Sequence, residues 1–262
     1  MAETARPPIR RAVRWLVCVG RRARPRARLI CVPYAGAATA AFRDWPASLP
    51  DWLEVWAVQP PGRESRLAEP PVTDLPTLVE SITAAMGTDL PGGEPLPYAL
   101  YGHSMGALVG FELAHAIPAA GHPPPAAMFV SGRRAPQIPD RLPSIHRLPR
   151  DEFLEQIQRL NGIPDAVLAE PGLLDLVLPN VAGDFAVIEP YVYRPRPRLA
   201  CGISAFGGDA DPTTAPEQVR AWREQTIGRF RMHIWPGDHF FINPHRDALL
   251  RALADDLGEA SA

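Results

Sequence analysis

The sequence contains no lysine, and all 27 of its basic residues are arginine. With 29 acidic residues, the formal net charge is -2. A domain that binds nucleic acid usually carries a strong basic excess over one face, so this balance argues against a nucleic-acid partner. The arginines that cluster between Arg6 and Arg28 are interpreted as solvated charge on an exposed hairpin, with a binding patch as the alternative.

Cysteine is scarce, and long apolar runs are absent. Cys18, Cys31 and Cys201 lack C-x-x-C spacing and lie in apolar stretches, which fits buried thiols in a reducing compartment. No stretch reaches the roughly 18 apolar residues that a membrane span needs, and the N-terminus has no apolar segment of signal-peptide length. We therefore expect a soluble, cytoplasmic protein with no membrane partner.

Apolar runs and helical patterns alternate along the chain. Its 262 residues suit a single large α/β domain, residues 1–262. The apolar runs predict strands at Trp15–Val19, Leu29–Val32, Leu53–Val58, Tyr98–Tyr101, Ala126–Val130, Ile203–Phe206 and Phe230–Trp235. Helices are predicted at Leu75–Met86, Ala107–Ile117, Pro216–Thr226 and Pro244–Leu257. This alternation predicts a mostly parallel sheet with helices on both faces.

The interval from Arg133 to Leu199 breaks the alternation, because it contains helical patterns and no convincing strand. Helices are predicted at Asp151–Leu160 and within Pro171–Phe185. The interval is too long for a connecting loop. We interpret about residues 133–199 as an inserted helical cap over the carboxyl ends of the strands, where it would shape a substrate tunnel and exclude water.

The motif Gly102-His103-Ser104-Met105-Gly106 lies between a predicted strand and a predicted helix. A G-x-S-x-G motif in this context is typical of a nucleophile elbow, in which glycines permit the close backbone approach of a sharp turn. The alternative is a tight structural turn. The motif therefore predicts Ser104 as a nucleophile, held beside the amides of a helix N-terminus.

A serine nucleophile needs a histidine base, and the histidine needs a carboxylate that orients it. His239 follows the last predicted strand, where its loop can reach Ser104; its alternative role is to cap the final helix. The carboxylate is expected after Ile203–Phe206, where Asp209 and Asp211 compete. We favour Asp211, because the following proline biases it towards an extended conformation, whereas Asp209 suits an Asx turn.

The order serine, aspartate, histidine is that of the α/β-hydrolase fold and differs from the orders in chymotrypsin and subtilisin. Acyl transfer also needs N–H donors for the developing oxyanion. The backbone amide of Met105 is one candidate donor. The amide of Ala35, in the loop after the predicted strand Leu29–Val32, is the other, although this loop alone would suggest a simple turn. The chemistry needs no metal or redox cofactor.

Six ordered motifs lie along the chain between about Leu29 and Leu257. They are Val32-Pro33-Tyr34-Ala35-Gly36 with Phe42-Arg43-Asp44-Trp45, Gln59-Pro60-Pro61-Gly62-Arg63-Glu64-Ser65-Arg66, Gly102-His103-Ser104-Met105-Gly106, Ser131-Gly132-Arg133-Arg134-Ala135-Pro136, Leu160-Asn161-Gly162-Ile163-Pro164 and Gly237-Asp238-His239-Phe240-Phe241. With these motifs the chain resembles the type II thioesterases, the free-standing α/β-hydrolases that accompany modular polyketide and nonribosomal peptide synthetases.

The resemblance implies hydrolysis of acyl groups from the phosphopantetheine arm of acyl or peptidyl carrier proteins, which clears stalled or wrongly loaded chains. It implies catalytic roles for Ser104, Asp211 and His239, and oxyanion roles for the amides of Ala35 and Met105. No cofactor is expected, because the phosphopantetheine is carried by the substrate. A monomer is the default expectation.

The chain departs from the family pattern at two places. Ala37 stands where the family often has a second glycine, and Val181-Ala182-Gly183-Asp184-Phe185 stands where the cap commonly has Leu-Arg-Ala-Asp-Phe. The missing arginine puts a salt bridge of the cap in doubt. Arg133 and Arg134 follow a predicted strand and are candidates for meeting an acidic carrier protein, with exposed charge flanking the cap as the equal alternative.

Two other functions share this pattern of residues. A carboxylesterase or lipase that acts on small diffusible esters would use the same three catalytic groups without recognising a carrier. A non-catalytic α/β-hydrolase receptor usually lacks one of the three groups, whereas Ser104, Asp211 and His239 are all present here.

Overall fold

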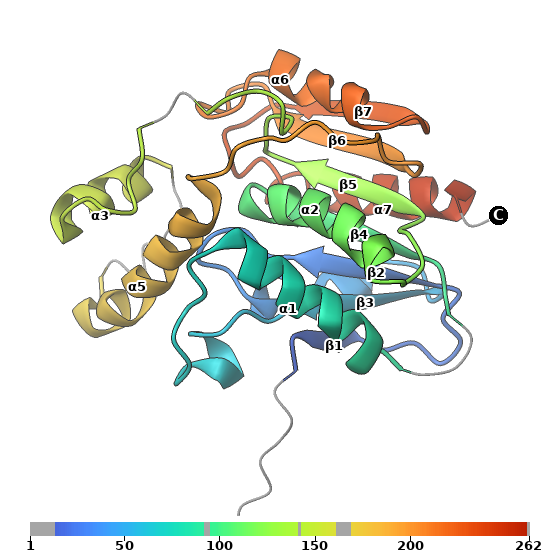
Figure 1. Cartoon of the computed structure of the whole chain (residues 1–262), viewed down its shortest axis with the longest axis horizontal. Coiled ribbons are helices and arrows are strands. Elements are labelled where there is room, and N and C mark those ends of the chain that lie inside the picture. Colours follow the sequence, from blue (N-terminus) through green and yellow to red (C-terminus); the bar gives the residue numbers. More distant parts are fainter. Residues whose placement is uncertain (1–13, 92–94, 141–142, 161–168, 261–262) are drawn as a thin grey trace, which may run out of the picture.

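A seven-stranded sheet forms the centre of the molecule (Figure 1). The computed structural model describes residues 14–91, 95–140, 143–160 and 169–260. The strand order is β1-β3-β2-β4-β5-β6-β7, and every neighbouring pair is parallel except β1 with β3. The strands are β1 (Leu16–Gly20), β2 (Ala27–Val32), β3 (Leu53–Val58), β4 (Tyr98–His103), β5 (Ala127–Ser131), β6 (Gly202–Gly208) and β7 (Phe230–Trp235). The predicted α/β class and mostly parallel sheet are confirmed.

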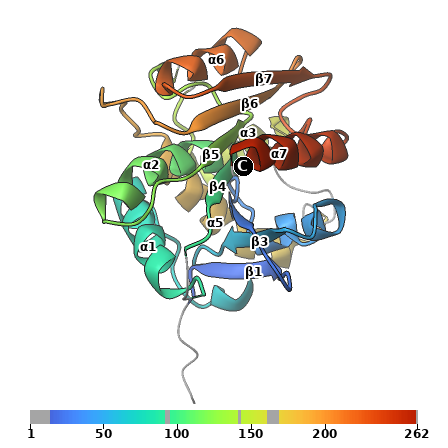
Figure 2. The ribbon, with the colours of Figure 1, turned by 90° about the vertical axis from the view of Figure 1, so that its right-hand side faces the viewer.

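Helices cover both faces of the sheet (Figure 2). The helices on one face are α1 (Leu75–Thr88), α2 (Met105–Ala119) and α6 (Pro216–Arg220), which continues as the 3-10 helix η4 (Ala221–Gln225). On the opposite face lies α7 (Arg246–Ala260), together with the short 3-10 helices η1 (Thr39–Phe42) and η2 (Trp45–Ser48). One further 3-10 helix, η3 (Glu64–Arg66), follows β3.

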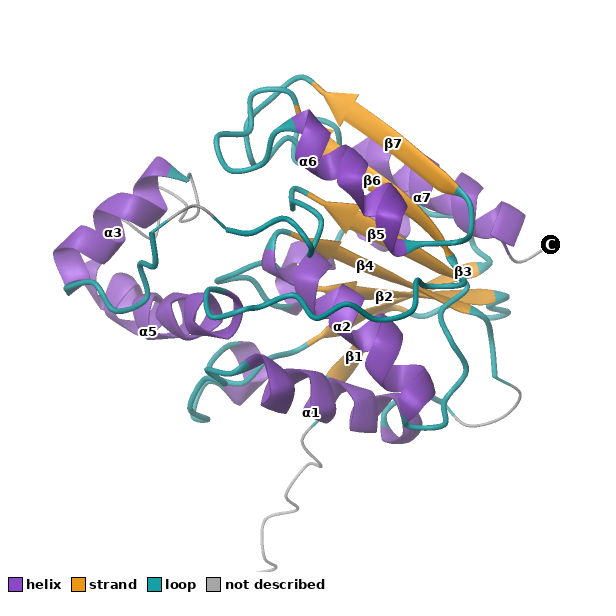
Figure 3. Cartoon of the chain, turned by 45° about the horizontal axis from the view of Figure 1, so that its top comes forward, coloured by secondary structure: helices purple, strands orange, loops and turns teal. Residues whose placement is uncertain are grey.

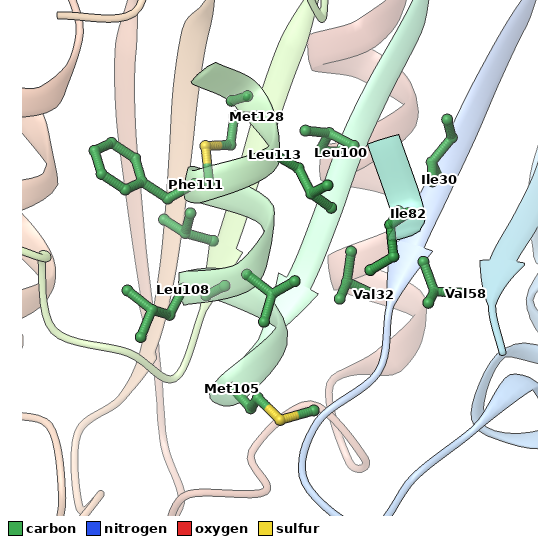
Figure 4. Close-up of a cluster of buried hydrophobic side chains, with 14 of the residues drawn as sticks. Ile30, Val32, Val58, Ile82, Leu100, Met105, Leu108, Phe111, Leu113 and Met128 are labelled. Atoms are coloured by element: carbon green, nitrogen blue, oxygen red, sulfur yellow. The ribbon is translucent and has the colours of Figure 1, made fainter. Parts of the chain in front are cut away.

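Strand side chains alternate between two hydrophobic clusters, because successive residues of a strand point to opposite faces. Ile30 and Val32 join the cluster under α1 and α2 (Figure 4). Leu29 and Cys31 join the cluster under α7. Central strands of a parallel sheet must therefore be apolar at nearly every position, which is why the sequence marks them as continuous apolar runs.

In the described residues between β5 and β6, two helices stand beyond the carboxyl ends of the parallel strands (Figure 3). They are α3 (Arg150–Arg159) and α5 (Pro171–Ile188), and we call them the helical insertion. The insertion has its own small cluster of buried side chains, to which Phe153, Ile157 and Leu178 belong. The predicted motif after Leu160 falls mostly on residues 161–168, which lie outside the described residues.

The hairpin expected in the N-terminal arginine cluster is wrong. β1 pairs antiparallel with β3, and β3 lies between β1 and β2. Arg22, in the segment that joins β1 to β2, donates hydrogen bonds to the carbonyl oxygens of Pro46 at 2.5 Å, Leu49 at 2.9 Å and Leu53 at 3.2 Å. Arg22 therefore anchors the connection to the body of the protein. Cluster arginines before residue 14 lie outside the described residues.

Within the described part of the chain, no helix combines the length and the apolar character that a membrane span requires.

Candidate active site

Ser104 occupies a strained turn between β4 and α2. Its backbone has φ 52° and ψ -114°, in a region that residues other than glycine rarely adopt. A Cβ atom on Gly102 would lie 2.0 Å from the carbonyl oxygen of Gly106, and a Cβ on Gly106 would lie 2.2 Å from that of Val32. Only glycine fits at either position, so the predicted strand-to-helix elbow and the reason for its two glycines are confirmed.

His239 and Asp211 come from adjacent loops that follow β7 and β6. Nδ1 of His239 lies 2.8 Å from Oδ2 of Asp211, and both residues are buried. Oδ1 of Asp211 accepts hydrogen bonds from the backbone N–H and the hydroxyl of Thr213, each at 2.8 Å. Burial by itself raises the pKa of Asp211, but His239 and Thr213 together outweigh it and leave the pKa below its usual value. The carboxylate therefore stays ionised beside the imidazole.

Asp209 has a different task from Asp211. Its Oδ1 accepts a hydrogen bond from the backbone N–H of Gly237 at 3.0 Å, and its side chain is exposed. This contact ties the loop after β6 to the loop that carries His239. Of the two aspartates that the sequence left in competition, the structure places Asp211 on the imidazole.

Ser104 and His239 line one cavity of about 380 Å³, together with Ala35, which we call the site cavity. Side chains of the helical insertion form part of its wall, including Phe185 and Ile188. Within the described residues, the Ser104 hydroxyl makes no hydrogen bond, so its contact with His239 stays a prediction. Catalytic hydrogen bonds are often long or poorly aligned in enzymes without substrate.

His103 lies beside His239, and the sequence analysis assigned it no role of its own. Its ring centroid lies 4.9 Å from that of His239, and its Nδ1 lies 3.0 Å from Oγ of Ser131. Burial lowers the pKa of His103 well below its usual value, and the nearby His239 adds to this effect. A neutral ring therefore supports the imidazole. A Cβ on Gly132 would lie 2.4 Å from Cε1 of His103, so the glycine at position 132 leaves the space that the His103 ring occupies.

The sequence predicted that the backbone N–H groups of Met105 and Ala35 donate to an oxyanion, and the structure shows the backbone around each residue. Met105 is the first residue of α2, so its N–H has no carbonyl partner within the helix. Ala35 lies in a four-residue turn that is closed by a 3.0 Å hydrogen bond from the N–H of Ala37 to the carbonyl oxygen of Tyr34. Ala35 also lines the site cavity.

The helical insertion does form a salt bridge, although the sequence put one in doubt. Asp184 of α5 accepts hydrogen bonds from both terminal nitrogens of Arg63, at 2.8 and 2.9 Å. Asp184 belongs to the motif that differs from the family pattern. It pairs with an arginine that follows β3, so the salt bridge needs no arginine at position 182. Burial raises the pKa of Asp184, and Arg63 and the backbone N–H of Gly36 oppose that shift.

The two arginines that follow β5 differ in their surroundings. Arg134 is buried and forms an ion pair with Asp140, so it does not offer the free charge that carrier docking needs. Arg133 lines the site cavity, where burial lowers its pKa to about 10, partly opposed by Tyr191. Only Arg133 of this pair remains a candidate for contact with an anionic partner.

A larger hollow of about 990 Å³ lies between α1, α2 and the segment that follows α5. None of the predicted site residues lines it. Nowhere in the described part of the chain do three or more histidine, cysteine, aspartate or glutamate side chains group around a possible metal position.

Comparison with known proteins identifies the family. The model of the thioesterase domain family matches residues 27–257. The gramicidin S biosynthesis protein GrsT of Aneurinibacillus migulanus is 38% identical over 93% of this chain and 94% of its own. Thioesterase PikA5 of Streptomyces venezuelae is 36% identical over 88% of this chain and 80% of its own.

Solved structures agree with the sequence matches. The RedJ thioesterase of prodiginine biosynthesis in Streptomyces coelicolor has 40% identity and a TM-score of 0.81, covering 88% of this chain and 91% of its own. The type II thioesterase BorB from the borrelidin cluster has 36% identity and a TM-score of 0.83, covering 93% and 97%. These neighbours have the α/β-hydrolase fold, which confirms the predicted fold. The chain therefore belongs to the thioesterase domain family, and it is a thioester-hydrolysing enzyme related to the type II thioesterases.

Proposed function

We propose that this enzyme hydrolyses acyl groups from the phosphopantetheine arm of carrier proteins and so removes stalled or wrongly loaded chains during polyketide or nonribosomal peptide synthesis. The names of its relatives support this role, because they include proteins of gramicidin S and prodiginine biosynthesis and ClbQ of the colibactin NRPS/PKS pathway. The observation that carries the proposal is the hydrogen bond from Asp211 to His239, since His239 lines the same cavity as the strained Ser104.

In the first half of the reaction, Ser104 acts as the nucleophile. His239 removes the proton of its hydroxyl as the oxygen attacks the thioester carbonyl, and Asp211 stabilises the charged imidazole. The same histidine then gives this proton to the departing pantetheine sulfur. The products of this half are a free thiol and an acyl ester on Ser104.

In the second half, water hydrolyses that ester. His239 takes a proton from the water as it attacks the acyl carbon, then returns it to the serine oxygen. Both halves develop negative charge on the carbonyl oxygen, and the N–H groups of Ala35 and Met105 are the proposed donors to it. These steps need no metal or redox cofactor.

The proposed partner is a carrier domain, met transiently by a monomeric cytoplasmic enzyme. A reducing compartment suits the chain, because its three cysteines are free and burial raises the pKa of the Cys31 thiol well above its usual value. Arg133 on the site cavity is the proposed contact for an anionic group of the loaded arm or its carrier.

The test compares hydrolysis of the same acyl group from a carrier protein and from a simple ester. We expect the wild type to hydrolyse an acylated carrier protein with a kcat/KM at least about 10-fold above that for the matched simple ester, because only the carrier can add binding contacts outside the cavity. Mass spectrometry of the carrier and release of free acid report the two rates. A large preference for the simple ester would indicate an ordinary esterase instead.

The control for this comparison is Ser104→Ala, which should lower turnover of both substrates by roughly 10³-fold or more. It should also form no covalent adduct with a serine-reactive phosphonate. The exposed Ser48→Ala, on η2 outside the site cavity, serves as the matched variant and should retain activity and the adduct.

A further inference from the structure

The turn that carries Ala35 is shaped by contacts on its outer side. Gly36 has φ 82°, the value that a type II turn requires at this position and that disfavours other residues. The carbonyl oxygen of Tyr34 points into the turn, towards the N–H of Ala37. Because the peptide bond is planar and trans, the N–H of Ala35 points away from that carbonyl. The orientation of the proposed oxyanion donor therefore depends on the turn keeping this shape.

The helix α5 grips this turn through Asp184. Oδ2 of Asp184 accepts a hydrogen bond from the backbone N–H of Gly36 at 2.7 Å. The same oxygen accepts one from Nη1 of Arg63 at 2.8 Å, and Oδ1 accepts one from Nη2 at 2.9 Å. Nη1 of Arg63 also donates to the carbonyl oxygen of Ala37 at 2.8 Å. Carboxylate and guanidinium thus hold the two consecutive residues that follow Ala35.

This arrangement is buried and specific. The side chains of Arg63 and Asp184 are only 9% and 6% exposed, so bulk water does not compete for their hydrogen bonds. A bidentate pairing of arginine with carboxylate also fixes relative orientation, which a single contact would not. Val181, one turn before Asp184, lies against Gly36, where a Cβ atom would approach its Cγ2 to 3.1 Å.

The same face of α5 reaches the site cavity. Counted from Val181, the residues Asp184, Phe185 and Ile188 follow after three, four and seven positions. This spacing places all four on one side of the helix. Phe185 and Ile188 line the cavity beside Ser104, while Val181 and Asp184 meet the turn. One helix face thus contacts both the space for the acyl chain and the turn of the proposed oxyanion donor.

We propose that Asp184 and Arg63 are positioning residues, which hold the Tyr34–Ala37 turn so that the N–H of Ala35 faces the reacting carbonyl and which couple this donor to α5. This inference rests on the proposed function, because it assumes that the Ala35 N–H stabilises the oxyanion. The pair acts through the turn and does not itself touch the substrate.

The test uses Asp184→Asn, which keeps the shape of the side chain but removes its charge. Turnover of a small acyl-N-acetylcysteamine thioester is measured per active site, after titration of the sites with a phosphonate. We expect kcat to fall about 10- to 100-fold while KM changes less than about threefold, since a mispositioned donor weakens the transition state more than the bound substrate. Affinity for a trifluoromethyl ketone, whose adduct carries the same oxyanion, should fall by a similar factor.

The matched control is Asp175→Asn, on the same helix, which removes an exposed ion pair with Arg150 and should leave all three quantities unchanged. Arg63→Lys, which keeps the charge but loses the bidentate geometry, should lower kcat and inhibitor affinity in the same way. Arg63→Lys therefore tests the positioning role even if Asp184→Asn does not fold.

If Asp184 and Arg63 only stabilise the fold, their variants should have lower thermal stability and fewer titratable sites, while kcat per site and inhibitor affinity stay at wild-type values. That result would overturn the inference. If the wild type hydrolyses its acyl-carrier substrate while both variants behave in this way, only the inference fails. A wild type without thioester turnover would overturn the proposed function as well.

Discussion

Asp209 and Asp211 leave the same strand two residues apart and do different work. Asp211 turns inward to His239, and Asp209 stays at the surface and binds the N–H of Gly237. The proline after Asp211 was the signal that separated them, because it favours an extended backbone that lets the side chain point sideways. Local backbone preference was thus enough to choose between two chemically identical candidates.

Replacing the two aspartates separately tests this difference. Asp211→Asn should lower kcat by roughly 10²- to 10⁴-fold, because the amide no longer stabilises the charged imidazole and favours the wrong tautomer. Asp209→Asn keeps an oxygen that can accept the Gly237 hydrogen bond, so its kcat should stay within about threefold of wild type. Steady-state turnover of an acyl thioester measures both. Equal losses in the two variants would contradict the assignment of Asp211.

The same aspartate predicts a pH dependence of stability. Against the upward effect of burial, His239 and Thr213 hold the pKa of Asp211 below its usual value in the folded protein. Its stabilising contribution is therefore fully present above the unfolded pKa, about 3.9, and is lost as the pH falls through the folded value. Urea denaturation should give a larger stability difference between wild type and Asp211→Asn at about pH 5 than at about pH 3. A pH-independent difference would contradict this.

Among the elements, the junction of β2, β4 and α2 depends on Gly102 and Gly106, where a side chain would collide with neighbouring backbone. We expect Gly106→Ala to destabilise the fold by about 2 kcal/mol or more, because its Cβ would lie 2.2 Å from the carbonyl oxygen of Val32. Gly110→Ala, on the same helix, meets only Cε of Met128 at 3.7 Å and should be neutral or stabilising by up to about 1 kcal/mol. Chemical denaturation of both variants measures the contrast, and similar destabilisation of the two would refute it.

Most elements could be predicted from the sequence, because parallel strands buried on both faces leave continuous apolar runs. The strand predicted at Leu53–Val58 has the same bounds in the structure. Pairing was harder: β1 was expected in a hairpin, yet β3 lies between β1 and β2. Nothing local in a strand specifies its neighbour.

The parts of the site that could not be predicted from the sequence depend on contacts between residues far apart in the chain. Arg63 and Asp184 are 121 residues apart, and each alone looks like an ordinary charged residue of a loop or helix. Their pairing depends on where α5 settles over the sheet. His103 was similarly hidden, because its contact with His239 follows from where the loop after β7 lies relative to the end of β4 rather than from the motif that contains it.

For the whole molecule, the helical insertion has a core of its own that is separate from the two clusters on the sheet. On α3, only Phe153 and Ile157 are buried, whereas all six residues of β4 are. Small cores open at lower free energy than the body of a domain. We expect the amides of α3 to exchange hydrogen by local opening and those of β4 only by global unfolding. Native-state hydrogen exchange measures both, and equal protection would contradict this.

The grip of α5 on the Gly36 turn restricts how the enzyme can be re-engineered for other acyl chains. A one-residue shift in the register of α5 would rotate its side chains by roughly 100° and carry Asp184 away from the turn. Selectivity altered through Phe185 or Ile188 therefore carries a risk to the reaction rate. Gln156 and Leu160 line the same cavity from the α3 side, and in the described part of the chain neither forms a hydrogen bond with that turn, which makes them the safer positions for redesign.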